Sequence, residues 1–320
     1  MNSKLLLETI KFAEPAQNDV GEPYKCHLKI QDGFMVATNA VMTVGIAIDM
    51  KVNCCPHTGK LIAALSKCKD EFRIKQTDSK RLQVVSGKMK AFVPCIPDPS
   101  MIPSVQPDPI AGVVDNRLKE SFLTVAPIVA DAAEQPLLFS VLIDSCSCIG
   151  TNSRVTLEHY HGIDLPRLLI PKKAALILGN VKKDMVKFGF SANSVTFYFE
   201  DGSWIKTQLS NDDGKDISTY LKYDAETEPV NAAIFEGLDV VLPFSEHGLV
   251  YLSEDSIRSH LPGDDSGAQF DLKGTEFPTM FNGRDLKSIQ KYAETIHFGE
   301  TKTHFFSGMC RGLIMNRRVK

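Results

Sequence analysis

Two short stretches of this chain, "VATNAVMT" (36–43) and "IGTNSRVT" (149–156), follow the same pattern of residues. Each lies where one strand-like run ends and the next begins: "GFMVATN" precedes "VMTVGIAID", and "CSCIGTN" precedes "RVTLEHYHGI". Because the two strings occupy corresponding places in two longer segments, they indicate an internal repeat. This repetition is the strongest signal of organisation in the sequence.

The repeat extends outward from these strings. A helical run precedes each string, and after the strand-like runs come a second helix and three further strands. The second helices are "PHTGKLIAALSKCK" (56–69), "PKKAALILGNVKK" (171–183) and, in the last third of the chain, "RDLKSIQKYAET" (284–295). The segment 232–247 fits either a helix or a strand, so the third repeat is less regular.

Two segments read as linkers between the repeats. Residues 94–109 contain six prolines, which exclude a helix or a central strand, and residues 210–229 are polar and acidic. We therefore expect three domains, at 1–100, 110–215 and 225–320, each near the typical domain size. The predicted fold class is α+β, with each domain built from a helix-plus-three-strands motif that occurs twice.

The composition is that of an ordinary water-soluble protein. The 320 residues carry a net charge of −3, with 43% apolar and 23% charged residues, and no run approaches the roughly 18 apolar residues of a membrane span. Glu8 and Glu14 interrupt the apolar pattern of the amino terminus, which argues against a signal peptide. The eight cysteines lack C-x-x-C spacing, so we expect reduced, mostly buried thiols in the cytoplasm.

The second helices place cations on one face. In 284–295, Leu286, Ile289 and Ala293 share a face and the cations lie opposite. One such helix would only indicate solubility, but equivalent stripes in a net-acidic chain favour a bound polyanion, contacted through its phosphates. The predicted DNA-facing cations are Lys4, Lys11, Lys60, Lys67, Lys172, Lys182, Lys183, Arg284, Lys287 and Lys291. The small residues predicted on the same faces are Ala63, Ala175 and Gly179.

Over its whole length the chain resembles the beta subunit of bacterial DNA polymerase III, the sliding clamp. The local matches are "RLLIPKKAALIL" (167–178), "SVTFYFEDGSWIKTQL" (194–209), "FPTMFNGRDLKSI" (277–289) and "CRGLIMNRRV" (310–319), and their order and spacing follow the family. The chain is shorter than typical bacterial members, which suits a divergent or phage-like one.

The resemblance implies a processivity factor of DNA replication. Two chains would close a homodimeric ring around double-stranded DNA, with inner helices, outer antiparallel sheets and sequence-independent contacts that allow sliding. The ring would tether DNA polymerase and the clamp loader in the cytoplasm of a bacterium or phage-infected host, associated with the nucleoid. No catalytic residue, cofactor or metal is expected.

The resemblance also implies a pocket for short partner peptides. Its residues, carried over by position, are Leu138, Thr151, Arg154, Val155, Met315, Arg318 and Val319. Two local departures from the family distinguish this chain: the "T-D-G-H-R-L" motif is shortened to "TNSRV", and Asn316 and Arg317 replace a proline and a methionine. We therefore expect a less apolar pocket and a ligand motif that can differ from the usual one.

Two other classes of function remain open. An enzyme could use His159 and His161 as metal ligands or a thiol of "SCSC" (145–148), but no third ligand or base is suitably spaced, so exposed strand histidines and ordinary strand packing are favoured. Neither a Walker loop nor a dinucleotide fingerprint is present. A ring-forming scaffold that kept the clamp architecture without DNA is the other alternative.

Overall fold

The computed structural model describes residues 3–18, 21–69, 71–211, 214–224, 226–261, 263, 266–276 and 278–319. Its contacts divide the chain into two compact units. The first comprises residues 1–119 and 177–209, and the second comprises residues 120–176 and 210–320. The boundary passes through two helices, α3 (Asn116–Val125) and α4 (Lys172–Asn180). The three-domain division stays a prediction.

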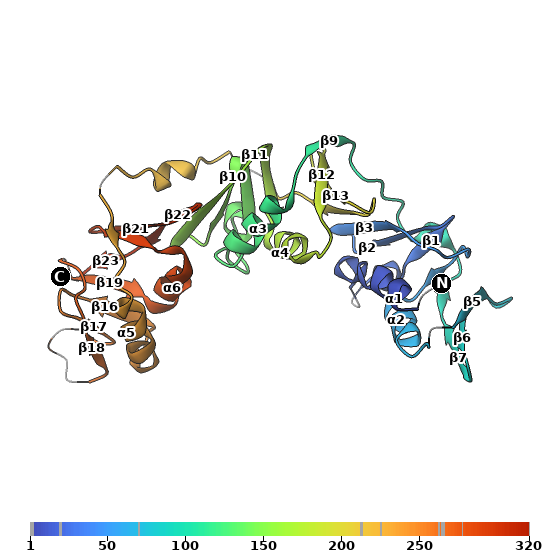
Figure 1. The fold of residues 1–320 in the computed structure, drawn as a ribbon, viewed down its shortest axis with the longest axis horizontal. Helices are drawn as coiled ribbons and strands as arrows, with labels where there is room; N and C mark the ends of the chain where they lie inside the picture. The colour runs from blue at the N-terminus through green and yellow to red at the C-terminus, as the bar shows by residue number, and fades with distance from the viewer. Residues whose placement is uncertain are drawn as a thin grey trace. The chain divides into compact units, whose positions relative to one another are not determined.

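The first unit is built on a seven-stranded antiparallel sheet in the order β1-β2-β3-β14-β13-β12-β9 (Figure 1). Its strands are β1 (Lys29–Gln31), β2 (Phe34–Thr38), β3 (Met42–Ala47), β9 (Ile110–Val113), β12 (Met185–Phe190), β13 (Ser194–Phe199) and β14 (Trp204–Gln208). The pair β3 and β14 joins distant segments of the sequence, with Trp204 opposite Gly45, 159 residues earlier. The indole lies where a Cβ on Gly45 would stand, so glycine is required there.

The first unit also holds a three-stranded sheet in the order β5-β6-β7 and a two-stranded pair, β4 with β8. The strands are β4 (Cys55–Pro56), β5 (Arg73–Gln76), β6 (Leu82–Ser86), β7 (Met89–Val93) and β8 (Cys95–Ile96). Two helices, α1 (Ser3–Lys11) and α2 (Thr58–Leu65), pack against each other. Leu6 and Ile10 are buried from α1, and Leu61 and Leu65 from α2, so the apolar face of each helix enters the core.

The second unit contains a six-stranded sheet, β10-β11-β22-β21-β20-β15, and a five-stranded sheet, β18-β17-β16-β19-β23. The strands are β10 (Ser140–Thr151), β11 (Val155–Pro171), β15 (Glu228–Pro229), β16 (Leu249–Leu252), β17 (Ser256–Arg258), β18 (Gln269–Asp271), β19 (Thr279–Asn282), β20 (Thr295–Phe298), β21 (Lys302–Ser307), β22 (Cys310–Met315) and β23 (Arg317–Arg318). The helices α5 (Ala233–Val241) and α6 (Gly283–Ser288) are neighbours in this unit.

The string "VATNAVMT" forms the hairpin turn between β2 and β3. The Thr38 hydroxyl lies 2.9 Å from that of Thr43 and accepts the N–H of Ala40 at 3.2 Å. The Oδ1 of Asn39 accepts the N–H groups of Val41 and Met42. Ala40 has a φ of +74°, an uncommon value for a residue with a side chain, and the surrounding hydrogen bonds hold it there.

The string "IGTNSRVT" forms the corresponding turn between β10 and β11 with the same hydrogen bonds. The hydroxyls of Thr151 and Thr156 lie 2.9 Å apart, and Asn152 Oδ1 accepts the N–H groups of Arg154 and Val155. The φ of Ser153 is +72°, like that of Ala40 in the first turn. The sequence repeat is therefore a repeat of one turn geometry.

Most predicted elements lie where the sequence placed them, and several differ. The run at 24–30 was expected to be a strand, but Pro23–Cys26 form a short 3-10 helix and β1 begins only at Lys29. The strand-like runs at 137–144 and 146–152 belong to one strand, β10, with a bulge at Ser145. Helix 284–295 is shorter, because α6 ends at Ser288 and a 3-10 turn (Gln290–Tyr292) follows it. The ambiguous segment 232–247 contains α5.

The linker residues are anchored. In the first unit Asp108 is buried and accepts hydrogen bonds from Ser194, Thr196 and Lys206. In the second unit Ile217 and Leu221 join a buried cluster whose other members are Leu137, Leu142, Ile149, Leu169 and Leu313. Asp108 is therefore fixed to β13 and β14, and Ile217 and Leu221 are fixed against the core beside β10 and β11.

Candidate nucleic-acid interface

The cations of α1 and α2 are exposed. Lys4 and Lys11 lie on the solvent side of α1, and Lys60 lies on that of α2 beside Ala63. Lys67 is also exposed, although α2 ends two residues before it. His57 caps α2 by accepting the N–H of Lys60 through its ring nitrogen, which fixes the first turn of the helix. The contact of these four cations with DNA stays a prediction.

Two cations of the middle repeat are engaged by carboxylates. Lys172 Nζ lies 2.7 Å from Asp131 Oδ1 and 2.6 Å from the carbonyl oxygen of Val129, and its side chain is 18% exposed. Lys183 Nζ lies 2.6 Å from Asp201 and 3.8 Å from the centre of the Phe12 ring. These partners offset both positive charges, whereas Lys182 is exposed.

The orientation of α4 differs from the predicted one. Ala175 and Gly179 were expected on the exposed face but are buried, together with Ala174 and Leu178. The prediction placed the buried face of α4 by its bulky apolar residues alone on a helical wheel. Because the small residues Ala175 and Gly179 are also buried, the apolar face is broader than predicted and its centre is shifted. The exposed cation of α4 is Lys173, which the sequence analysis did not select.

The cations around α6 differ among themselves. Leu286, Ile289 and Ala293 are buried, which confirms the predicted apolar face, and Arg284 and Lys291 are exposed. Lys287 instead forms an ion pair with Asp239 of α5, with 2.6 Å between Nζ and Oδ2. Arg284 of α6 and Lys291 of the following 3-10 turn are therefore more exposed than Lys287.

Four of the predicted pocket residues meet where β11 begins. Met315 donates its N–H to the carbonyl oxygen of Arg154 at 2.7 Å, and Val155 pairs with Ile314 across β11 and β22. Thr151 and Val155 are buried, so neither side chain offers an open wall, while Met315 is 41% exposed.

Leu138 and Val319 lie on the elements that flank this junction. The half-buried Leu138 belongs to a 3-10 helix (Pro136–Phe139) that packs against β10. Val319 is also half-buried and donates its N–H to the carbonyl oxygen of Pro278. The side chain of Arg318 lies outside the described residues, although its backbone pairs with Thr279.

Arg154 connects this junction to α6. Its guanidinium Nε lies 2.5 Å from Asp285 Oδ2; the arginine side chain is 59% exposed and the carboxylate is 10% exposed. Asp285 sits in the first turn of α6, whose Asn282 cap accepts the N–H groups of Arg284 and Asp285. A carboxylate there is stabilised by the helix dipole, so the hairpin turn and the helix start are tied together.

The whole chain superposes on solved structures of bacterial replication proteins. The beta subunit of Streptococcus pyogenes DNA polymerase matches with a TM-score of 0.85 at 16% identity, covering 100% of this chain and 99% of that chain. The Pseudomonas aeruginosa DNA polymerase III subunit beta matches with a TM-score of 0.85 at 11% identity, with the same coverage. The Helicobacter pylori beta clamp bound to a DNA ligase peptide matches with a TM-score of 0.78 at 13% identity, covering 99% of this chain and 98% of that chain.

The chain has the bacterial sliding-clamp fold. Neither a protein-family model nor a curated protein sequence matches it. The likeness therefore lies in the course of the backbone, and little of it lies in residue identity.

In this sliding-clamp fold, Asn316 has a structural role. It was expected to make the peptide pocket more polar, but it is 5% exposed. Its Nδ2 donates to the carbonyl oxygen of Gly299, and its Oδ1 accepts the hydroxyl of Thr303. The amide thus holds the turn between β20 and β21, whereas Arg317 is exposed.

The two histidines considered as metal ligands are held in the core. His159 and His161 are buried, so the expectation of exposed strand histidines was wrong, and His159 Nδ1 lies 2.7 Å from the Ser121 hydroxyl. Burial lowers the pKa of His159, which keeps the ring neutral near pH 7. Within the described ranges, no group of three or more His, Cys, Asp or Glu residues could hold a metal ion.

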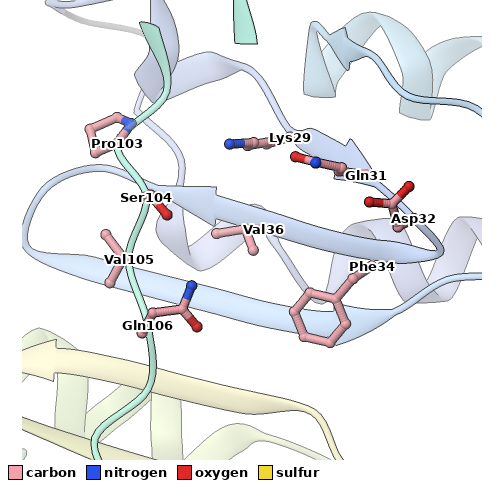
Figure 2. A pocket seen from close by; sticks show the side chains of 9 residues that line it. All are labelled: Lys29, Gln31, Asp32, Phe34, Val36, Pro103, Ser104, Val105 and Gln106. Atoms are coloured by element: carbon pink, nitrogen blue, oxygen red, sulfur yellow. The ribbon is translucent and has the colours of Figure 1, made fainter. Parts of the chain in front are cut away.

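A cavity in the first unit lies outside the predicted sites. Figure 2 shows it between the segment 103–106 and the strands β1 and β2, and its volume is about 210 Å³. Lys29 and Asp32 are its ionisable lining residues. Among the described residues, no helix combines the length and apolarity needed to cross a membrane.

Proposed function

We propose that this protein is a DNA sliding clamp. Two chains close into a ring around duplex DNA and hold a polymerase and other replication proteins at the template, without catalysing a reaction themselves. The observation that carries the proposal is the match of the entire chain to bacterial clamp structures. The proposed place of action is the cytoplasm of a bacterium or of a phage-infected cell.

The exposed cations support the DNA part of the proposal. Seven of the ten selected residues are exposed: Lys4, Lys11, Lys60, Lys67, Lys182, Arg284 and Lys291. Lysine and arginine contact phosphates without reading bases, so the interaction is independent of sequence and sensitive to salt. A ring that relies on topology for retention needs only such weak contacts.

The junction of β11 and β22 supports the proposal of peptide partners. The Helicobacter pylori clamp of the same fold carries a DNA ligase peptide. Here Met315 and Leu138 offer apolar surface, and the exposed Arg154 guanidinium could receive a carboxylate of a bound peptide. We propose that polymerase and clamp loader bind at this place through short motifs.

Retention on circular DNA tests the proposal. The protein is loaded by its cognate loader onto a nicked circle and onto the linear form of the same sequence, and bound protein is separated by gel filtration. A clamp persists on the circle and is lost from the linear molecule, because only an end lets the ring slide off. Equal loss from both forms would refute the topological mechanism. A solution mass of twice 35.4 kDa is expected for the ring.

One observation favours a scaffold of the same fold that does not encircle DNA. Lys172, Lys183 and Lys287 are each paired with a carboxylate, so the positive potential along the helices is weaker than the sequence indicates. A scaffold would form the same oligomer and would ignore both DNA forms in the retention experiment.

A further inference from the structure

The cavity of Figure 2 lies where the two repeats differ in chemistry. The hairpin turns show which residues correspond: Asp32 and Ser145 each precede the first threonine of their turn by six residues, and both have a φ of +51°. Counted in the same way, Lys29 of β1 corresponds to Leu142 of β10. Leu142 is fully buried in the apolar cluster of the second unit. The first unit therefore has a lysine at a place where the second unit has a core leucine.

A second lysine replaces a core leucine on a neighbouring strand. Lys206 of β14 pairs with Thr43, and Leu313 of β22 pairs with Thr156, the last threonine of each turn. Lys206 and Leu313 are thus equivalent, and Leu313 belongs to the same buried cluster. The charge of Lys206 is offset in the first unit, because its Nζ lies 3.0 Å from Oδ1 of the buried Asp108.

The first lysine has no such partner. Lys29 is half-buried, and with the residues that the structure describes it forms no ion pair. Figure 2 shows its side chain directed across the cavity toward the segment 103–106, with Asp32 at the opposite end. An ammonium group that is partly removed from water without a counter-ion is unfavourable. An anion bound in the cavity would remove that penalty.

The rest of the lining combines apolar surface with hydrogen-bonding groups. Phe34, Val36 and Val105 are half-buried and offer apolar surface, while Gln31 and Gln106 contribute exposed amides. The volume of about 210 Å³ is smaller than the roughly 300–1,000 Å³ of sites for drug-sized ligands. The cavity therefore fits one or two side chains better than a whole cofactor.

The charges of the cavity favour a carboxylate over a phosphate. Lys29 is its one lining cation, and Asp32 brings a negative charge to the same space. A phosphate group carries about −1.5 to −2 charges near neutral pH, so Asp32 would repel the part that Lys29 leaves unmatched. A carboxylate carries a single negative charge, which one ammonium group balances.

We propose that this cavity binds an acidic segment of a partner protein. Lys29 pairs with a glutamate or aspartate carboxylate, and an apolar side chain of the same segment packs on Phe34. Lys29 is directly opposite Val36, and Gln31 is opposite Phe34, so Phe34 lies one row along the sheet, about 7–8 Å from Lys29. Side chains on one side of an extended segment repeat at a similar spacing, so the acidic and apolar residues are two positions apart. The choice of a peptide as occupant rests on the proposed function, which places peptide partners beside the second hairpin turn.

Anisotropy titrations of the full-length protein with labelled peptides test the proposal. The probe is Leu-Ser-Glu-Ser-Leu with blocked ends, which places a leucine two positions from the glutamate in either chain direction. The matched peptide has glutamine in place of glutamate. The unaltered protein should bind the acidic peptide about tenfold more tightly, because a hydrogen bond between two charged groups contributes more than one to a neutral amide.

Two substitutions of Lys29 should abolish this discrimination. With Lys29→Gln and Lys29→Leu, the acidic and the glutamine peptide should bind equally weakly, since the ammonium group is gone. Lys29→Leu should keep the fold, because leucine is the residue that the second unit carries at the equivalent place. The matched control is Lys51→Gln, which removes an exposed lysine of the same unit outside the lining and should leave both affinities within about twofold.

Three results would overturn the proposal. The first is equal binding of the two peptides by the unaltered protein, and the second is discrimination that persists in both Lys29 variants. The third is displacement of the probe by N-acetylglutamate or inorganic phosphate at the concentration at which the probe itself half-saturates the protein, which would indicate a small anion as ligand. Retention on circular duplex DNA is measured in parallel. Protein that is retained but does not distinguish the peptides overturns only the cavity site, whereas protein that distinguishes them and is lost from the circle overturns only the clamp function.

Discussion

The exposed cations of the last repeat give the sharpest test of DNA contact. The perturbation is the double substitution Arg284→Gln and Lys291→Gln, which removes two exposed charges and keeps side chains of similar length. The fold should tolerate it, because the helix start is held by the Asn282 side chain and by backbone N–H groups. The control is Lys287→Gln with Asp239→Asn, which removes a neighbouring ion pair without changing the net charge.

The expected magnitude follows from counterion release. Each phosphate contact to duplex DNA contributes about 0.9 to the slope of log K against log[salt], so two lost contacts flatten the slope by about 1.8. Taking the electrostatic part as zero at 1 M salt, the same two contacts supply close to 60-fold in affinity at about 0.1 M salt. The control should change affinity less than about threefold, since an exposed ion pair of this kind contributes little net field.

An equilibrium titration with short labelled duplex DNA at several salt concentrations measures both quantities. Circular dichroism and gel filtration establish that each variant keeps its fold and oligomeric state. If the double substitution leaves affinity and slope unchanged, Arg284 and Lys291 do not face DNA. If the control loses as much affinity as the double substitution, DNA binding depends on the packing of α5 against α6 and not on the exposed charges of Arg284 and Lys291.

Three further predictions concern stability. Leu313→Ala should lower the free energy of unfolding by about 2–5 kcal/mol in urea denaturation, because Leu313 is 3% exposed within a buried cluster; a loss below about 1 kcal/mol would contradict that packing. Asn152→Ala should cost about 1–3 kcal/mol because two N–H groups lose their acceptor, whereas Asn152→Asp keeps it and should cost less. Burial raises the pKa of Asp108, but hydrogen bonds led by that of Lys206 outweigh it and hold the pKa below 3.8. The charged form therefore stabilises the fold at neutral pH, and this stabilisation is lost as the pH falls below about 4; Asp108→Asn should reduce that acid dependence of the urea midpoint.

The sequence predicted secondary structure correctly where the spacing of apolar residues fits only a strand or only a helix. Alternation of apolar residues located β2, β3, β12 and β13, and the buried face of α6 followed from Leu286, Ile289 and Ala293. Periodicity could not detect that β10 continues through a bulge, because the bulge at Ser145 breaks the alternation while the hydrogen-bonded ladder resumes beyond it.

The candidate site was harder to predict, because helix periodicity assigns a face but does not supply ion-pair partners. Asp131, Asp201 and Asp239 are distant in the sequence from the lysines they neutralise. Lys173 was missed because the exposed face of α4 was predicted from its bulky apolar residues alone. Ala175 and Gly179 are buried as well, so the exposed face lies on the side of Lys173.

The paired Thr–Asn turns have a consequence for the ancestry of the chain. Each turn uses two hydroxyls and one amide at fixed positions: the amide oxygen accepts two N–H groups, and the first hydroxyl accepts one N–H and bonds to the second hydroxyl. The strands around the turns need only remain apolar on one side, so their amino-acid sequences can diverge. We expect the residues of these turns to change more slowly than the rest of the chain. If the repeats arose by duplication, the turns should remain recognisable in related proteins whose strands no longer show the repeat.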